Sequence, residues 1–421
     1  MMNQINSILI ANRGEIASRI IRTCQKMGIK SIAIYSEADR NAAYVQHADM
    51  AVFIGESTPT VSYLNQEKII EVTKEMKADA IHPGYGFLAE NAEFAKRCKI
   101  ENIIFIGPTS EVIDLMGSKS NAKLLMQKNG VPVIPGYQGE DQSEQRLREE
   151  VIKMGFPVLL KATAGGGGKG MRIVQNEKEL TEAIKSAKRE SNNAFGDDKL
   201  IVEKYITNGR HIEFQIFGDQ HGHVVHLLER ECSIQRRFQK IIEESPSPIM
   251  DEELRNKMGA AAIKAAKAIN YQNAGTVEFI YDEISKEFYF LEINTRLQVE
   301  HPVTEEITGL DLVQMQIETA QGTPLEILQE DIKGTGYAVE VRLYAEDSAN
   351  NFLPMTGIVE LFEVPEINGL RVETAVQSGS AISIYYDPMI AKLIVWDKTR
   401  QSAHRKMQVC ASPVSLFRYD N

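Results

Sequence analysis

Apolar strand patterns alternate with amphipathic helix patterns over the first hundred residues, and this alternation restricts the possible folds most. The segment SILIA leads into the turn NRGE, a helical pattern from Ile16 to Met27 and a second strand pattern, KSIAIYS. The same order returns in EKIIEVTKEMKA, ADAIHPG, ENAEFAKRC and NIIFIGP. Such alternation predicts a doubly wound α/β domain, with parallel strands between layers of helices, that closes near Ser110.

A small α+β lobe and a β-rich part are predicted to follow. Residues 119–130 fit a helix that a glycine ends, and the prolines of VPVIPGY are typical of a connection. The segment FPVLLKATAGGGGKGMRIVQ predicts two short strands around a glycine loop. Strand patterns dominate from Arg210, and a last β-rich block begins near Gly336. We therefore predict an α/β protein with three domains, over residues 1–115, 116–330 and 331–421.

Charge and cysteine content exclude several classes of partner. The 421 residues include 47 Lys and Arg against 58 Asp and Glu, and no basic run could neutralise a string of phosphates, so no nucleic-acid partner is expected. Four cysteines lie far apart without a CxxC pair, which favours a reducing, cytoplasmic location. No segment approaches the roughly 20 apolar residues of a membrane span, so no membrane partner is expected either.

A glycine-rich segment, GGGGKG at residues 165–170, joins the two predicted strands. Because it does not open a helix, it does not fit a dinucleotide-binding fingerprint, and Met171 stands where a P-loop would require lysine. The backbone amides of a glycine hairpin can approach phosphates closely, and Lys161 and Lys169 add positive charge. We interpret the segment as a phosphate-binding loop; a surface loop with no binding role is the alternative.

Two acidic residues and an amide are predicted to share one face of a β hairpin. A turn near Ser285 would place Glu278 opposite Glu292, and Asn294 would point to the same face. Two carboxylates and an amide oxygen suit a Mg²⁺ ion that bridges nucleotide phosphates. The alternative is a pair of surface glutamates, but the apolar neighbours would then bury two unpaired charges.

A polar segment follows this hairpin directly, with Arg296, Gln298, Glu300 and His301 ahead of a proline. A guanidinium beside a carboxylate is suited to binding and deprotonating a small oxyanion. A structural salt bridge between Arg296 and Glu300 fits the spacing equally well, so both interpretations stay open from the spacing alone.

Taken together, these motifs resemble the biotin carboxylases of the ATP-grasp superfamily. The similarity runs from about Ile8 to about Lys406 and is carried, in order, by ANRGEIA, IHPGYGFLAEN, MGSK, KATAGGGGKGMR, ECSIQRRFQK, GTVEF and LEINTRLQVEHPVTE. The resemblance implies an N-terminal doubly wound domain, an ATP-grasp domain with a mobile lid at about residues 131–206, and a β-rich C-terminal domain.

The resemblance also implies a role for each matching position. Glu203 would lie at the adenine, with Lys204 and Ile206 offering hinge backbone, and His211 and Gln235 would hold the sugar. The implied ATP-binding set is Lys119, Lys161, Gly166, Gly167, Gly168, Glu203, Lys204, Ile206, His211, Gln235, Glu278 and Glu292. The implied metal ligands are Glu278, Glu292 and Asn294, and the implied bicarbonate and biotin pockets comprise Tyr85, Arg296, Gln298, Val299, Glu300 and Arg342.

The chemistry implied is the carboxylation of biotin with ATP, Mg²⁺ or Mn²⁺, and bicarbonate. ATP would phosphorylate bicarbonate to carboxyphosphate, which would break down to CO₂ and a basic phosphate. Glu300 would deprotonate bicarbonate and Arg342 would steady the biotin enolate; Arg296 and Lys240 complete the implied catalytic set.

The resemblance further implies a homodimer. The sequence has no AMKM biotin-attachment motif, so biotin is expected on a separate carrier protein, with the carboxyltransferase on another chain. Which acyl-CoA accepts the carboxyl group is unreadable.

Two departures from the family pattern leave alternatives open. Phe238 stands where many members have histidine, and the segment after Lys406 no longer resembles the family. Since a proline at residue 413 would interrupt a helix, we expect an under-packed C-terminal domain. An ATP-grasp ligase with another acceptor, such as a carbamoyl phosphate-forming enzyme, and a truncated subunit without catalytic activity are the alternative functions.

Overall fold

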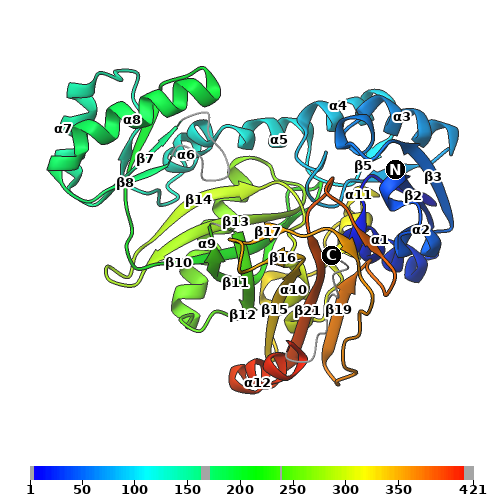
Figure 1. Ribbon diagram of the computed structural model, residues 1–421. Helices are drawn as coiled ribbons and strands as arrows, with labels where there is room; N and C mark the ends of the chain where they lie inside the picture. The colour runs from blue at the N-terminus through cyan, green and yellow to red at the C-terminus, as the bar shows by residue number, and fades with distance from the viewer. Residues whose placement is uncertain (1–3, 163–170, 238, 412–421) are drawn as a thin grey trace.

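The computed structural model describes residues 4–162, 171–237 and 239–411, and Figure 1 shows how their elements are arranged. The N-terminal part is a five-stranded parallel sheet in the order β3-β2-β1-β4-β5. Its strands are β1 (Ser7–Ile10), β2 (Lys30–Ser36), β3 (Met50–Gly55), β4 (Ala80–His82) and β5 (Ile104–Phe105). The helices around it are α1 (Gly14–Met27), α2 (Ala43–His47), α3 (Gln66–Glu75), α4 (Ala92–Ile100) and α5 (Ser110–Gly117). The predicted doubly wound arrangement is confirmed.

Helix α1 brings its first turn to the carboxyl end of β1. Ile16, Ile20 and Cys24 recur at helical spacing and are buried in the core beneath the sheet. The helix ends at Gly28, whose φ of 67° lies in the left-handed region that favours glycine. The first turn thereby carries Glu15 into the buried interior, towards the rest of the molecule.

A small lobe stands apart from the main body, as Figure 1 shows for α7, α8, β7 and β8. It is an antiparallel sheet in the order β6-β9-β7-β8, with α7 (Glu144–Met154) and α8 (Glu177–Phe195). The strands are β6 (Gly136–Tyr137), β7 (Val158–Ala162), β8 (Arg172–Val174) and β9 (Leu200–Lys204). The two strands predicted around the glycine loop are thus confirmed as β7 and β8. The loop itself lies outside the described residues.

The largest sheet has eight antiparallel strands, in the order β14-β13-β10-β11-β12-β15-β21-β19. Their bounds are β10 (Gly209–Gly218), β11 (Val224–Arg236), β12 (Gln239–Ser245), β13 (Asn273–Asp282), β14 (Phe288–Asn294), β15 (Tyr337–Tyr344), β19 (Leu370–Thr374) and β21 (Met389–Asp397). Strand β12 pairs with β15, so one sheet continues through the domain boundary predicted at residue 330. The predicted boundaries and the predicted lid stay predictions.

Five further helices and four short strands complete the described chain. The helices are α6 (Lys119–Lys128), α9 (Glu252–Ala268), α10 (His301–Thr308), α11 (Leu312–Ala320) and α12 (Arg400–Ala411), with 3-10 turns at Glu37–Asp39, Pro59–Val61 and Gln329–Asp331. The short strands are β16 (Glu346–Asp347), β17 (Leu353–Pro354), β18 (Gly357–Ile358) and β20 (Ala381–Ile382). Within the predicted last β-rich block, the apolar segment GIVELFEV (residues 357–364) forms a strand over its first two residues only.

Helix α12 packs against the eight-stranded sheet through Ala403, Met407 and Cys410, which are buried. The proline expected to interrupt this helix lies outside the described residues. Among the residues described, no helix combines the length and apolar character needed to cross a membrane.

Candidate active site

A cavity of about 700 Å³ opens between the small lobe and the eight-stranded sheet. Most of the residues predicted for the site line it, although they come from separate stretches of the chain. They are Lys119, Lys161, Glu203, Lys204, Ile206, His211, Gln235, Lys240, Glu278, Glu292, Asn294, Arg296, Gln298, Val299 and Arg342. The fold therefore brings the predicted nucleotide, metal and bicarbonate residues to one cavity.

Three groups of predicted residues stand apart from this lining. Glu300 is fully buried directly behind it, and Tyr85 lies outside it, in the loop after β4. Gly166, Gly167 and Gly168 lie outside the described residues, as does Phe238.

The predicted acidic face is present at the edge of the large sheet. Glu278 of β13 lies directly opposite Glu292 of β14, and the Asn294 amide donates a hydrogen bond of 2.8 Å to Glu278. Glu292 forms an ion pair of 3.0 Å with Lys119, at the start of α6. Two carboxylates and an amide that share one face and line the same cavity are a donor set that suits Mg²⁺ or Mn²⁺.

Lys240 is the positive centre of the buried part of the site. Its ammonium contacts Glu213 at 2.5 Å, Glu278 at 2.8 Å and Glu300 at 2.7 Å. Burial alone would lower its pKa, but the three carboxylates outweigh burial and hold the pKa of Lys240 well above its usual range. Lys240 is therefore charged and connects the metal face to Glu300.

Glu300 is held between cations on both of its oxygens. Oε1 accepts from Lys240, and Oε2 accepts from the Arg342 guanidinium at 3.1 Å. Burial raises the pKa of Glu300, yet Lys240, Arg342 and Arg230 outweigh burial and hold that pKa well below its usual range. The carboxylate is thus ionised throughout the neutral pH range.

Arg342 is fixed from behind by a second carboxylate. Its Nε donates to Oε1 of Glu243 at 2.7 Å, and Glu243 is fully buried. Burial raises the pKa of Glu243 to about 7, although Arg342 opposes this rise. Glu340, directly opposite Glu243 in the sheet, is also fully buried, and its carboxyl oxygens have no hydrogen-bond partner among the described residues.

Arg296 turns away from Glu300, contrary to the salt bridge that the spacing also allowed. Its Nε donates to Glu90 at 2.8 Å and its Nη1 donates to Gln298 at 2.8 Å. Glu90 also accepts from the backbone amide of Thr295 at 3.0 Å. Because Glu90 lies just ahead of α4, the N-terminal part of the chain orients the polar segment that follows β14.

The other end of the cavity contains Glu203 between two lysines. Lys123 contacts Oε1 of Glu203 at 2.8 Å, and Lys161 contacts Oε2. Burial would raise the pKa of Glu203, but Lys161 and Lys123 outweigh it and lower that pKa. The structure thus brings Lys161, expected at the phosphates, into contact with Glu203, expected at the adenine.

His211 and Gln235 are brought together between these two ends. Gln235 Nε2 lies 3.2 Å from Nδ1 of His211, whose Nε2 lies 2.9 Å from Oε2 of Glu278. Burial opposes protonation, but Glu278 outweighs it, so the pKa of His211 is raised.

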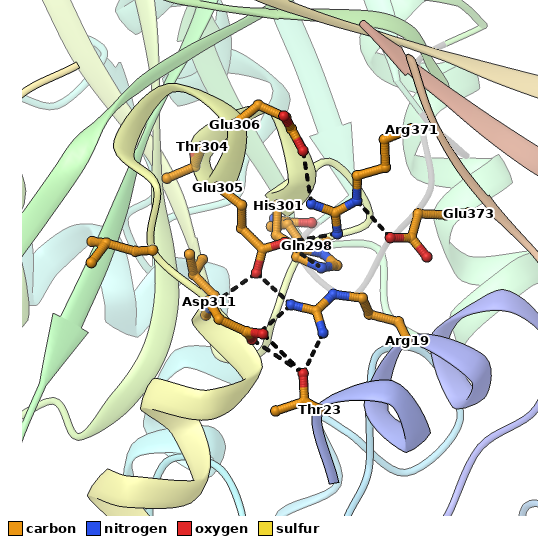
Figure 2. A network of polar contacts seen from close by, with 12 residues as sticks. Arg19, Thr23, Gln298, His301, Thr304, Glu305, Glu306, Asp311, Arg371 and Glu373 are labelled. Carbon is orange, nitrogen blue, oxygen red and sulfur yellow. Dashed lines mark hydrogen bonds and ion pairs between the residues drawn. The ribbon is translucent and has the colours of Figure 1, made fainter. Parts of the chain in front are cut away.

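A network of charged residues anchors α10, the helix that begins directly after Glu300 (Figure 2). Arg19 of α1 contacts Glu305 at 2.7 Å and Asp311 at 2.7 Å. From the other side, Arg371 of β19 contacts Glu305 at 2.8 Å and Glu373 at 2.7 Å. Elements from the beginning and the end of the chain therefore fix the helix that directly follows Glu300.

Three family models together match most of the chain. Residues 4–113 match the biotin carboxylase N-terminal domain, residues 118–328 the carbamoyl-phosphate synthase L chain ATP-binding domain, and residues 340–415 the biotin carboxylase C-terminal domain. Biotin carboxylase 2 of Bacillus subtilis is 54% identical over 95% of this chain and 90% of its own length. The chain belongs to the biotin carboxylase family. This result confirms the predicted family, the predicted fold class and the predicted enzyme class, an ATP-dependent ligase.

Other relatives and solved structures extend the similarity. The methylcrotonoyl-CoA carboxylase alpha subunit of Mus musculus mitochondria is 55% identical over 96% of this chain, which spans only 57% of that subunit. The chain spans little more than half the length of the first such subunits that it matches.

Among solved structures, the biotin carboxylase–β,γ-ATP complex of Campylobacter jejuni superposes with a TM-score of 0.93 at 48% identity, over 98% of this chain and 92% of that one. The biotin carboxylase domain dimer of Hydrogenobacter thermophilus 2-oxoglutarate carboxylase, in complex with MgADP, ADP and bicarbonate, gives 0.92 at 48% identity, over 99% and 91%.

Several residues of this biotin carboxylase site were missed in the sequence, and Arg230 is the clearest case. It is fully buried and donates to Glu213 at 2.5 Å, Gln215 at 2.8 Å and Thr304 at 2.9 Å. A signal for its partners was available in HIEFQIF, where Glu213 and Gln215 alternate with apolar residues, but the same pattern fits a strand with one face in solvent. Glu90, Lys123, Glu243 and Lys392 gave no comparable signal, because each acquires its role from residues far away in the sequence.

Proposed function

We propose that this chain uses ATP to carboxylate biotin with bicarbonate, the first half-reaction of a biotin-dependent carboxylase. The observation that carries the proposal is the environment of Glu300, a fully buried and ionised carboxylate between Lys240 and Arg342. Its neighbours Gln298 and Val299 line the nucleotide cavity, so an oxyanion beside them would meet both a base and cations.

The nucleotide is proposed to extend from Glu203 to the acidic face. Glu203 would accept from the adenine, the backbone of Lys204 and Ile206 would flank it, and His211 with Gln235 would hold the sugar. Lys119 and the glycine segment would approach the phosphates, and Lys161 would turn from Glu203 towards them. Glu278, Glu292 and Asn294 would hold Mg²⁺ or Mn²⁺, which, when bound, offsets negative charge on the phosphoryl oxygens.

The reaction itself is proposed to occur beside Arg296 and Arg342. Bicarbonate would be bound by Arg296, Gln298 and Val299. Glu300 would accept the bicarbonate proton as a bicarbonate oxygen attacks the γ-phosphorus of ATP. Loss of ADP leaves carboxyphosphate, which breaks into CO₂ and phosphate. The phosphate would take the proton from the ureido nitrogen of biotin, and that nitrogen attacks CO₂ while Arg342 stabilises the enolate. Tyr85 is proposed to shape the biotin pocket.

The proposed partners are a biotin carrier and a carboxyltransferase. The Mus musculus relative is a subunit of an acyl-CoA carboxylase, and this chain spans about half of it, so both functions are proposed to reside on other polypeptide segments. We also propose a homodimer, since the Hydrogenobacter thermophilus domain is a dimer. A cytoplasmic location is still inferred from the cysteines alone, all four of which are free and buried.

The deciding experiment is ADP release by the purified chain with and without bicarbonate and free biotin. We expect ATP cleavage that depends on bicarbonate, rises with biotin and yields carboxybiotin. ATP cleavage that is indifferent to biotin would point to an ATP-grasp ligase with another acceptor. A chain that binds ATP but releases no ADP under any condition would instead be a subunit without catalytic activity.

A further inference from the structure

A fully buried lysine lies between the proposed bicarbonate and biotin pockets. Lys392 is in the middle of β21, and none of its side chain is exposed. A lysine is almost never buried completely unless its charge is compensated. Since Lys392 does not line the cavity, its partners must explain its presence.

Those partners come from opposite ends of the chain. The Lys392 ammonium donates to the backbone carbonyl of Val299 at 2.7 Å and lies 3.2 Å from Oε1 of Glu15. The same Glu15 oxygen accepts a hydrogen bond from the Tyr85 hydroxyl, and the Lys392 ammonium lies 6.0 Å from the centre of the Tyr85 ring. One buried ion pair therefore contacts Val299, next to Glu300, and Tyr85, in the loop after β4.

The charged residues opposite Lys392 in the sheet have direct partners of their own. Lys392 lies directly opposite Arg342 in the β15–β21 pairing and directly opposite Glu373 in the β19–β21 pairing. Arg342 is already paired with Glu243 and Glu300, and Glu373 with Arg371. Among the described residues, the direct contacts of the Lys392 ammonium are therefore Glu15 and the Val299 carbonyl, and it also acts electrostatically on the buried Glu340. A carbonyl group that accepts from a charged donor is held firmly, so Lys392 can orient Val299.

We propose that Lys392 and Glu15 form a positioning pair that fixes the Val299 carbonyl and the Tyr85 hydroxyl relative to each other. The pair thereby holds the bicarbonate pocket and the biotin pocket at a constant relative position. The inference rests on the proposed function for what the two pockets bind. The pair touches neither substrate. Its effect is geometric, because CO₂ released beside Val299 must meet a biotin nitrogen held beside Tyr85, and misplacement by about 1 Å can cost about 100-fold in rate.

Lys392→Met tests the pair most directly, since methionine fills a similar volume without the charge or the donor. We expect the KM for bicarbonate and the KM for biotin each to rise about tenfold or more, with the KM for ATP within about twofold of the parent, because the nucleotide residues are not contacted. Glu15→Gln keeps the lysine on Val299 but leaves only a neutral acceptor for the Tyr85 hydroxyl, which holds it less firmly, so the KM for biotin should rise more than the KM for bicarbonate. It also provides a test if Lys392→Met fails to fold.

Arg255→Met is the matched control. Arg255 forms a two-point contact with the buried Glu229, at 2.8 and 2.9 Å, and neither residue lines the cavity. The control should lose stability without a selective change in any KM. If Lys392→Met and Glu15→Gln change all kinetic constants in the same proportion as Arg255→Met does, the pair is merely structural and the proposal is overturned.

Amide hydrogen exchange separates this inference from the proposed function. Lys392→Met should accelerate exchange in segments 83–86 and 295–300 together, while Arg255→Met should leave both unchanged. If the parent chain shows no bicarbonate-dependent ADP release but both segments loosen in Lys392→Met, the positioning pair stands and the proposed function is wrong. If ADP release is as proposed but neither segment loosens, the positioning pair is wrong.

Discussion

Arg342 and Glu300 meet inside the protein, where Nη2 of Arg342 lies 3.1 Å from Oε2 of Glu300 while Lys240 contacts the other oxygen at 2.7 Å. If either cation moves away, one oxygen of the buried Glu300 carboxylate loses its charged partner, at a cost of several kcal/mol. This arrangement explains how a base with a strongly lowered pKa can be retained next to a substrate that is itself an anion. In the proposed reaction, the negative charge of bicarbonate would be met by the same cations that hold Glu300.

Glu300→Gln should keep ATP binding and abolish most turnover. Glutamine fills the same volume and can still accept from Lys240 or Arg342, but it cannot accept the bicarbonate proton, so kcat should fall by about 10²- to 10⁴-fold. The measurements are nucleotide binding by titration calorimetry and bicarbonate-dependent ADP release. Loss of ATP binding in a folded variant would assign Glu300 a structural role.

The sequence predicts most securely those parts of the site that lie close together along the chain. Glu278 and Glu292 were predicted to face each other because a short turn fixes the register of two adjacent strands, and the pairing is as expected. Asn294 follows from the same alternation. The resemblance supplied the remaining cavity residues, because it carries long-range information that periodicity lacks.

Contacts between segments that lie far apart in the chain could not be predicted from the sequence. Arg296 was expected to meet either an oxyanion or Glu300, yet its ion pair is with Glu90, 206 residues earlier in the chain. Lys392 lies in the apolar strand MIAKLIVW, where nothing local reveals that Glu15 compensates its charge. The continuous sheet through β12 and β15 could not be predicted either, because pairing between strands nearly a hundred residues apart leaves no periodic signal.

Glu90→Gln should weaken bicarbonate binding selectively. The Glu90 carboxylate orients both the Arg296 guanidinium and the Thr295 amide. A neutral glutamine holds the guanidinium less firmly. The KM for bicarbonate should therefore rise about three- to tenfold, while the KM for ATP stays constant. Steady-state ADP release at varied bicarbonate measures this change. Glu93→Gln, at an exposed position in the helix that follows Glu90, should have no effect. Equal behaviour of the two variants would exclude Glu90 from a positioning role.

Lys123→Met should raise the KM for ATP. Lys119 and Lys123 are one helical turn apart on α6, and Lys123 holds one oxygen of the buried Glu203 while Lys161 holds the other. Without Lys123, that oxygen loses its partner and Glu203 becomes easier to protonate. A protonated Glu203 accepts a hydrogen bond from adenine less well, so we expect the KM for ATP to rise about fivefold. ATP titration of the variant is the measurement, and Lys128→Met, exposed in the last turn of α6, is the control. An unchanged KM would mean that Lys161 alone keeps Glu203 ionised.

The buried histidines should lower stability as the pH falls from 7.5 to 5.5, while Glu243, whose pKa of about 7 lies above its unfolded value, gains a proton in the same range and acts in the opposite direction. Burial lowers the pKa of His82 to about 3 and that of His226 to about 4, from an ordinary value of 6.5. Below pH 6.5 these histidines are therefore protonated in the unfolded chain but neutral in the folded protein. Each histidine then lowers the unfolding free energy by about 1.4 kcal/mol per pH unit. The carboxylates with lowered pKa, Glu278 and Glu300, stabilise the fold above their unfolded pKa of 4.5 and lose that contribution only at lower pH. Urea unfolding at pH 7.5, 6.5 and 5.5 measures the slope, which His226→Gln should reduce. If His226→Gln and the parent have the same slope, His226 is protonated in the folded protein and the prediction is wrong.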